Sequence, residues 1–225
     1  MATWLVGDIH GCAAELARLV DALALAAGDR VVALGDLVHR GPDPLGVVRL
    51  LGQVGAEFVL GNHEHVFLRR NGLAPREAAG RERGPWTPAE LVGDAGRALC
   101  VAPGDAPEVV GFLLGSAGYF LEDEGEGGRW SAVHAGVTPG KEARDSEVED
   151  LVYPARLAER GRPFWFERYE GEALVVFGHL AREQPIVMKR AGRTVAVGVD
   201  TGCVLGGKLT AYSPERDEFR EVRAR

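Results

Sequence analysis

Side chains that bind divalent metals follow short apolar runs at five places in this chain of 225 residues. Imidazole and carboxylate groups suit first-row metal ions, and one carboxylate can bridge two ions that lie about 3.5–4 Å apart. Residues i and i+2 of an extended segment point to the same side. The pattern predicts a two-metal site, with candidates at Asp8 and His10 after residues 4–6, Asp36 after 31–34, Asn62 and His63 after 58–60, His134 after 130–133, and His179 after 174–177.

Each of these residues alone has a simpler interpretation. A single aspartate at the end of a strand is usually a turn or capping residue, and a single histidine is usually a packed or surface side chain. The repetition of the same arrangement after five apolar runs favours a shared site. His65 lies outside this arrangement, and we expect it to be a packing residue.

The elements that would position these side chains alternate along the first 60 residues. Strands are predicted at 4–6, 31–34 and 58–60, and apolar residues recur at helical spacing over 16–23 and 45–54. This alternation is typical of a parallel α/β sheet with right-handed crossovers. Sites in such sheets form outside the carboxyl ends of the strands, where the candidate residues lie.

The rest of the chain predicts a second group of strands. Apolar runs at 119–121, 130–133, 173–177, 186–188, 194–199, 209–212 and 218–222 are interrupted by one charged stretch, 146–159, that we expect to be helical. Five prolines punctuate residues 69–118, which we interpret as a small helical cap inserted into a single domain that spans 1–225. The predicted fold is α/β with an antiparallel C-terminal portion, arranged as two sheets flanked by helices.

Composition narrows the possible partners and location. The chain is 46% hydrophobic with a formal net charge of −7, which indicates a globular protein without the basic surface of a general nucleic-acid binder. It shows no apolar run of about 18 residues that would span a membrane and no signal peptide. The three cysteines lack metal or disulfide spacing. We therefore expect a cytoplasmic protein, with its oligomeric state left open.

Three motifs give the chain a resemblance to a known family. Gly7-Asp8-Ile9-His10-Gly11, residues 35–41 and Gly61-Asn62-His63-Glu64 resemble the calcineurin-like metallophosphoesterases, and more narrowly the phosphoprotein phosphatase superfamily. Residues 134–136, 178–179 and 200–203 extend the likeness almost to the end of the chain. The resemblance implies a four-layer α/β/β/α sandwich and two divalent ions, manganese first, with iron, zinc, cobalt or nickel as alternatives.

The resemblance also implies a role for each candidate residue. The reaction would be in-line hydrolysis of a phosphoric ester or anhydride by a hydroxide that the two ions activate. Arg40 would bind phosphate through its planar fork of donors, and His63 would be the general acid. The implied metal ligands are Asp8, His10 and the bridging Asp36 for one ion, and Asp36, Asn62, His134 and His179 for the other, with Arg156 as candidate for the family's second phosphate-binding arginine.

One departure from the protein phosphatases bears on the substrate. His39 stands where those enzymes carry an aspartate that orients the catalytic histidine, and the symmetrical dinucleoside tetraphosphatases, which also resemble this chain, lack that aspartate too. A serine alkoxide needs a proton to leave, whereas a phosphate oxygen with a pKa of about 6 leaves readily as an anion. This difference favours a dinucleoside polyphosphate such as diadenosine tetraphosphate as the substrate.

Other functions remain open from the sequence. The first alternative is a protein Ser/Thr phosphatase acting on a phosphoprotein, in which His39 serves as hydrogen-bond partner of His63; the motif ending in Glu64 is shared with that class. A 2′,3′-cyclic or polynucleotide phosphatase is a further enzyme alternative. A non-catalytic metal-binding scaffold is the alternative from another class. In the predicted cap, Trp86 is a candidate for stacking on an adenine ring.

Overall fold

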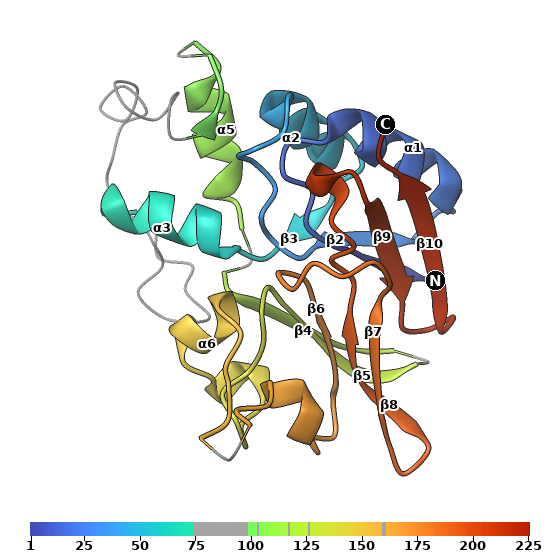
Figure 1. The fold of residues 1–225 in the computed structure, drawn as a ribbon. Helices are drawn as coiled ribbons and strands as arrows, with labels where there is room; N and C mark the ends of the chain where they lie inside the picture. Colours follow the sequence, from blue (N-terminus) through green and yellow to red (C-terminus); the bar gives the residue numbers. More distant parts are fainter. Residues whose placement is uncertain (74–98, 103, 117, 126, 159–160) are drawn as a thin grey trace.

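Ten strands form two sheets in the computed structural model, which describes residues 1–73, 99–102, 104–116, 118–125, 127–158 and 161–225. The first sheet has the order β10-β9-β1-β2-β3 and the second the order β4-β5-β6-β8-β7 (Figure 1). The strands are β1 (Thr3–Val6), β2 (Arg30–Ala33), β3 (Glu57–Phe58), β4 (Phe120–Gly125), β5 (Gly128–Val133), β6 (Leu174–Phe177), β7 (Ile186–Arg190), β8 (Arg193–Gly198), β9 (Lys208–Ser213) and β10 (Glu218–Arg223).

The first sheet is parallel from β1 to β3 and antiparallel from β1 to β10, and the second has a parallel centre with an antiparallel strand at each edge. β1, β2 and β3 run parallel, and β5, β6 and β8 run parallel in the second sheet. β9 pairs antiparallel with both β1 and β10, so the last strands of the chain complete the sheet that its first strand begins. The carboxyl ends of the parallel strands of a sheet meet at one edge, and this arrangement positions the candidate residues.

Helices cover the outer faces of the two sheets. α1 (Ala13–Leu23) packs on β9 and β10, and α2 (Pro44–Gln53) packs between α1 and α5 (Ala106–Leu113). Figure 1 shows these three helices on one side of the molecule and the shorter elements of the other sheet on the opposite side. Those shorter elements are the 3-10 segments η2 (Ala143–Asp145) and η3 (Trp165–Arg168) and the helix α6 (Val148–Val152).

Alternating side chains along β1 show the layers directly. Leu5 packs into a buried cluster with residues of both sheets, among them Val32 and Val176. Its neighbours Trp4 and Val6 belong to the cluster that the helices cover. Because successive residues of a strand point to opposite faces, this alternation places one apolar core between the sheets and others under the helices. The predicted four-layer α/β/β/α sandwich is confirmed.

Two helices differ from the sequence prediction. α3 (Asn62–Arg70) was not expected, because its first turn is a polar Asn-His-Glu-His run that lacks an apolar periodicity. The predicted helix over 146–159 is wrong in extent, since α6 ends at Val152. Pro154 has no backbone N–H and restricts the residue before it, which accounts for the early end of α6.

The end of the predicted cap packs as an ordinary helix. In α5, Phe112 stacks on Phe58 with ring centroids 4.8 Å apart, and Glu108 accepts hydrogen bonds of 2.8 Å from Arg49 of α2. Residues 74–98, which include Trp86, lie outside the described residues, so the cap and the role of Trp86 stay predictions. Within the described ranges, no helix has the length and apolarity needed to cross a membrane.

Leu5→Ala tests the core between the sheets. The Leu5 side chain is fully buried, so its truncation removes apolar contacts and leaves a cavity. We expect the free energy of unfolding of the metal-free protein in urea to fall by about 3 kcal/mol. Val187→Ala on β7, where the side chain is 44% exposed, is the control and should change stability far less. Equal effects of the two substitutions would contradict the assigned core.

Candidate metal centre

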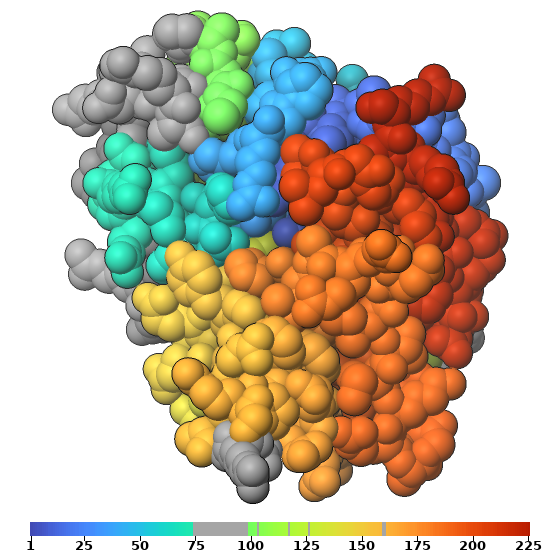
Figure 2. Space-filling model, viewed as in Figure 1, coloured from blue at the N-terminus to red at the C-terminus, as the bar shows by residue number. Residues whose placement is uncertain are grey.

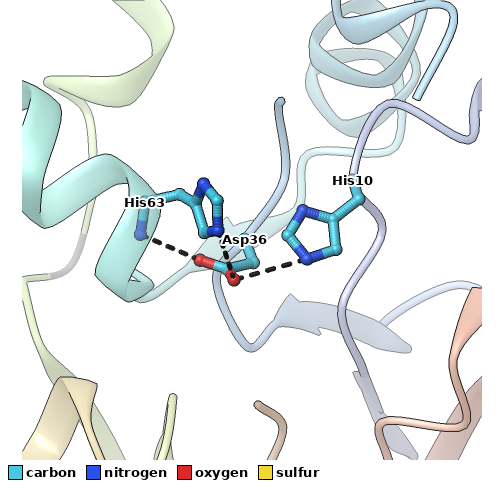
Figure 3. A group of neighbouring side chains, drawn as sticks. All are labelled: His10, Asp36 and His63. Carbon is cyan, nitrogen blue, oxygen red and sulfur yellow. Dashed lines mark hydrogen bonds and ion pairs between the residues drawn. The ribbon is translucent and has the colours of Figure 1, made fainter. Parts of the chain in front are cut away.

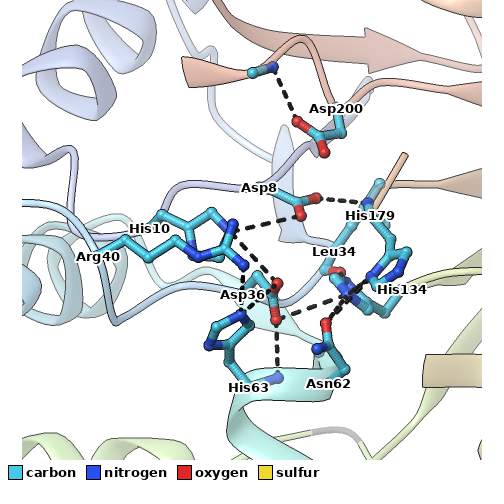
Figure 4. Close-up of polar contacts among 12 residues, drawn as sticks. Asp8, His10, Leu34, Asp36, Arg40, Asn62, His63, His134, His179 and Asp200 are labelled. Carbon is cyan, nitrogen blue, oxygen red and sulfur yellow. Dashed lines mark hydrogen bonds and ion pairs between the residues drawn. The ribbon is translucent and has the colours of Figure 1, made fainter. Parts of the chain in front are cut away.

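The predicted site residues gather at the carboxyl ends of strands from both sheets. Asp8 and His10 follow β1, Asp36 follows β2, His134 follows β5 and His179 follows β6. α3 begins at Asn62 and carries His63 in its first turn. Figure 4 shows these side chains pointing toward one another, with Arg40 reaching across from the loop after Asp36. The structure thus brings together all six predicted ligands, His63 and Arg40.

The Asp36 carboxylate lies at the centre of this cluster. Its Oδ2 is 3.4 Å from Nε2 of His10 and 3.9 Å from Nε2 of His63 (Figure 3). Its Oδ1 faces the other way, 3.6 Å from Nε2 of His134, and accepts a hydrogen bond of 3.1 Å from the backbone N–H of His63. Two oxygens that face two groups of donors are what a ligand shared by two ions requires.

One group of donors converges on a single point. Nε2 of His134 lies 3.0 Å from Nδ1 of His179, and Oδ1 of Asn62 lies 3.0 Å and 3.1 Å from these two nitrogens (Figure 4). Nδ1 of His134 is 2.8 Å from the carbonyl oxygen of Leu34, which accepts its proton and leaves a lone pair on Nε2. Two imidazoles and an amide oxygen so arranged fit a divalent cation.

The other group lies on the β1 side of Asp36. Nε2 of His10 is 4.0 Å from Oδ2 of Asp8, and Oδ1 of Asp8 accepts a hydrogen bond of 2.9 Å from the backbone N–H of His179. Arg40 closes this side, with Nη1 3.3 Å from Nε2 of His10 and Nη2 3.0 Å from Nε2 of His63. Its guanidinium therefore lies beside His10 and His63, where it could bind an anion held against ions at the cluster.

Burial disfavours the charge of every acid in the cluster. The pKa of Asp36 is raised to about 7, mainly by burial, and the pKa of Asp8 is raised well above its usual value by burial and by the neighbouring Asp200 and Asp36 carboxylates. Carboxylates that repel one another in a low dielectric are stable as anions only with a cation among them.

The imidazoles show the opposite shift for the same reason. Burial lowers the pKa of His134 and of His179 to about 4, and it lowers the pKa of His10 to about 3 with a further contribution from the Arg40 charge. These rings are neutral near pH 7 and present lone pairs. Neutral imidazoles and uncompensated carboxylates are together a donor set that fits divalent metal ions.

The backbone at the site adopts conformations that side chains rarely tolerate. Ten non-glycine residues among those described have positive φ, and five of them belong to the site: His10, Asp36, His39, Arg40 and His179. Such strain collects where function requires a particular geometry. Gly61 allows the close approach, because a Cβ there would lie 2.2 Å from Oδ1 of Asp36.

Glu64 is a site residue for which the sequence suggested no structural role. Its fully buried carboxylate accepts four backbone hydrogen bonds, from the N–H groups of Asp36, Leu37, Val38 and Gly61, at 2.8–3.3 Å. The bond from Gly61 caps α3, and those from 36–38 fix the loop that carries Asp36. The usable signal was the glutamate at the third position of a helix, which is typical of a capping box.

Asp200 belongs to residues 200–203, which extend the family likeness, but it is not among the ligands that the resemblance implies. Its carboxylate lines the same cavity as Asp8 and accepts a hydrogen bond of 2.9 Å from the N–H of Gly202. Asp200 follows β8 just as Asp8 follows β1, so the strand-end pattern was sufficient to find it. His39 lies beside the catalytic candidate, with its ring centroid 5.0 Å from that of His63.

Arg156 is the one predicted site residue that the structure does not bring to the cluster. Its guanidinium lies 3.7 Å from the centroid of the Phe164 ring and donates a hydrogen bond of 2.9 Å to the carbonyl of Arg162. These contacts hold the side chain on the loop after α6. The assignment of Arg156 as second phosphate-binding arginine therefore receives no support from the geometry.

Comparison with known proteins identifies the family. A model of the calcineurin-like phosphoesterase family matches residues 1–194. The chain belongs to this family. A bis(5′-nucleosyl)-tetraphosphatase of the asymmetrical PrpE type from Geobacillus thermodenitrificans is 30% identical over 92% of this chain and 88% of its own length. A symmetrical bis(5′-nucleosyl)-tetraphosphatase from Aeromonas salmonicida is 29% identical over 96% of both chains.

A solved structure extends this likeness to three dimensions. A crystal structure described as that of a candidate diadenosine tetraphosphatase superposes with a TM-score of 0.77 at 28% identity and covers all of this chain and 94% of its own. The calcineurin-like phosphoesterase described here is therefore a hydrolase of phosphoric ester or anhydride bonds, in a family that uses divalent metals. Its fold and donor set agree with that chemistry.

Asp36→Asn tests the central carboxylate. Manganese that binds only the folded protein raises the melting temperature, and we expect this rise in the wild type and its loss in the variant. Activity should disappear together with this thermal shift. Each oxygen of the Asp36 carboxylate faces a different group of donors, and an amide keeps only one of the two oxygens. Asp21→Asn on the exposed face of α1 is the matched control. A variant that keeps both the manganese-dependent shift and activity would contradict the assignment.

Glu64→Gln tests whether the buried glutamate positions Asp36. The amide keeps one acceptor, so two of the four backbone N–H groups would face a donor instead. We expect manganese affinity, measured by calorimetry, to fall about 10- to 100-fold. Glu149→Gln, in an exposed pair with Arg69, should leave affinity unchanged. An unchanged affinity in Glu64→Gln would show that the loop holds its position without this carboxylate.

Proposed function

We propose that this phosphoesterase hydrolyses dinucleoside polyphosphates such as diadenosine tetraphosphate, with two manganese ions. Asp8, His10 and Asp36 would hold one ion, and the convergent group Asn62, His134 and His179 would hold the other together with Asp36. When bound, the ions supply Lewis acidity, which makes a water molecule more acidic and neutralises charge on phosphoryl oxygens. Asp36 would fix the spacing of the two ions.

The remaining steps fall to Arg40 and His63. Arg40 presents its planar fork beside His10 and His63 and would bind two non-bridging oxygens of the reacting phosphoryl group. This contact would orient phosphorus for in-line attack. His63 is 23% exposed at the edge of the cluster, and its Nε2 lies 3.0 Å from Nη2 of Arg40, so it would contact the leaving oxygen. We assign it the role of general acid or hydrogen-bond donor.

The residues around His63 support the proposed class of substrate. The ring beside it is His39 rather than a carboxylate, and the Arg40 guanidinium contacts its Nε2. The only described carboxylate in contact with its ring is Asp36, which the ions would share. A positively charged imidazolium is poorly supported in these surroundings. Such a site suits a leaving group that departs as an anion, as a nucleoside diphosphate does, better than a serine alkoxide.

The names of the relatives support the same class. Both the asymmetrical and the symmetrical relatives are tetraphosphatases acting on bis(5′-nucleosyl) substrates by name. Protein Ser/Thr phosphatase activity is the second candidate, and the observation that favours it is the position of His39, which is close enough to orient His63 in place of the aspartate. A non-catalytic scaffold is disfavoured, because all six proposed ligands are present and converge.

Product analysis with manganese-loaded protein tests the proposal. We expect diadenosine tetraphosphate to yield ADP as the only nucleotide product on chromatography, and a phosphoserine peptide to release phosphate far more slowly. If ATP and AMP formed in equal amounts instead, the enzyme would cleave diadenosine tetraphosphate asymmetrically. Rapid peptide dephosphorylation without any nucleotide product would overturn the proposed substrate in favour of the protein phosphatase.

A further inference from the structure

Large apolar side chains are exposed at few positions, and two of these border the metal centre. Among the residues that the structure describes, those exposed are Met1, Tyr153, Val187 and Leu205. Single exposed apolar side chains are common on protein surfaces, so the informative ones here are those that line the cavity of the metal centre or contact its residues. Tyr153 and Leu205 both meet this condition, and they lie on different sides of the metal centre.

Leu205 lies on the side of the cluster that carries Asp200. The cavity that Asp8, Asp36 and Asp200 line is also lined by the apolar side chains of Ala181, Val204 and Leu205. Leu205 ends the short 3-10 turn η4 (Cys203–Leu205) and is 73% exposed. These three side chains offer no charge to a phosphate group. They offer an apolar surface to whatever is attached to the phosphates.

Tyr153 lies on the side of the cluster that carries His179. It follows α6, is 38% exposed, and its ring stands at 89° to the His179 ring with centroids 6.2 Å apart. The Tyr153 ring therefore borders one group of candidate ligands. Figure 2 shows the segment after α6 (yellow) and the segment around η4 (orange-red) on the same face, on either side of a hollow where blue, cyan and orange segments meet.

We propose that Tyr153 and Leu205 are contacts for the two nucleosides of the substrate, one on each side of the phosphate chain. This inference rests on the proposed function and deepens it. Purine rings stack on aromatic side chains and pack on aliphatic ones, whereas phosphates gain nothing from either. Apolar contacts on two sides of the reacting phosphoryl group select a molecule with an apolar group at both ends. A dinucleoside polyphosphate has this form, and a phosphoserine peptide does not require it.

Binding measurements can separate the nucleosides from the phosphates. The probes are a non-hydrolysable methylene-bridged analogue of diadenosine tetraphosphate and inorganic tripolyphosphate, each titrated into manganese-loaded protein in a calorimeter. The variants are Tyr153→Ala and Leu205→Ser. Val187→Ser is the matched control, because Val187 is 44% exposed on β7 and does not line the cavity.

We expect Tyr153→Ala to raise the Kd of the analogue about tenfold, as the loss of one stacking contact does, and Leu205→Ser to raise it about threefold to fivefold. The Kd of tripolyphosphate should stay within about twofold in both, and Val187→Ser should change neither. Equal weakening of both probes would overturn the proposal, because the residues would then act through the metal centre. An unchanged Kd of the analogue would overturn it as well.

A failure of the proposed function can be distinguished from a failure of the proposed nucleoside contacts. Wild-type protein that dephosphorylates the peptide but leaves diadenosine tetraphosphate intact would remove the function and with it the nucleoside contacts. Wild-type protein that cleaves the dinucleotide, combined with unaffected analogue binding in both variants, would remove the nucleoside contacts alone.

Discussion

The buried Asp36 carboxylate is the contact around which the site is assembled. It is 2% exposed, and its two oxygens face imidazoles of both sheets. A carboxylate removed from water in this way is costly unless charge or hydrogen bonds compensate it. The protein supplies the backbone N–H of His63, while the loop that carries Asp36 is tied to α3 by Glu64. The Arg40 charge also favours the Asp36 anion, and bound cations would add further compensation, which would link metal affinity to the stability of this part of the fold.

The two-sheet architecture explains how so many donors reach one carboxylate. The first sheet delivers Asp8 and Asp36 from adjacent parallel strands, and the second delivers His134 and His179 from its own adjacent pair. Hydrogen bonds cross between these groups, from His179 N–H to Asp8 and from His134 to the Leu34 carbonyl. The packing between the sheets therefore sets the separation of the two halves of the site.

The sequence was sufficient where position follows from strand direction alone. The carboxyl ends of the parallel strands of one sheet meet at one edge, so Asp8 could be placed beside Asp36, and His134 beside His179, without coordinates. Asp200, after β8, could have been placed beside His179 by the same reasoning. The meeting of these two groups depends on the packing between the sheets. The beginning of α3 could not be placed from the sequence, because a polar first turn resembles a loop and its stability comes from the buried contacts of Glu64. The environment of Arg156 depends on a stacking partner, Phe164, brought to it by a turn that spacing does not reveal.

The position of β9 has a consequence for biosynthesis. β1, which leads to Asp8 and His10, is flanked on one side by β2 and on the other by β9, a strand formed by residues 208–213. A ribosome would have released most of the chain before the sheet around β1 could close, and His179 would also emerge late. Contacts between such distant segments form slowly. The nascent chain would thus expose Asp8, His10 and Asp36 well before His134 and His179 are available, and the candidate metal centre would be assembled only at the last stage of folding.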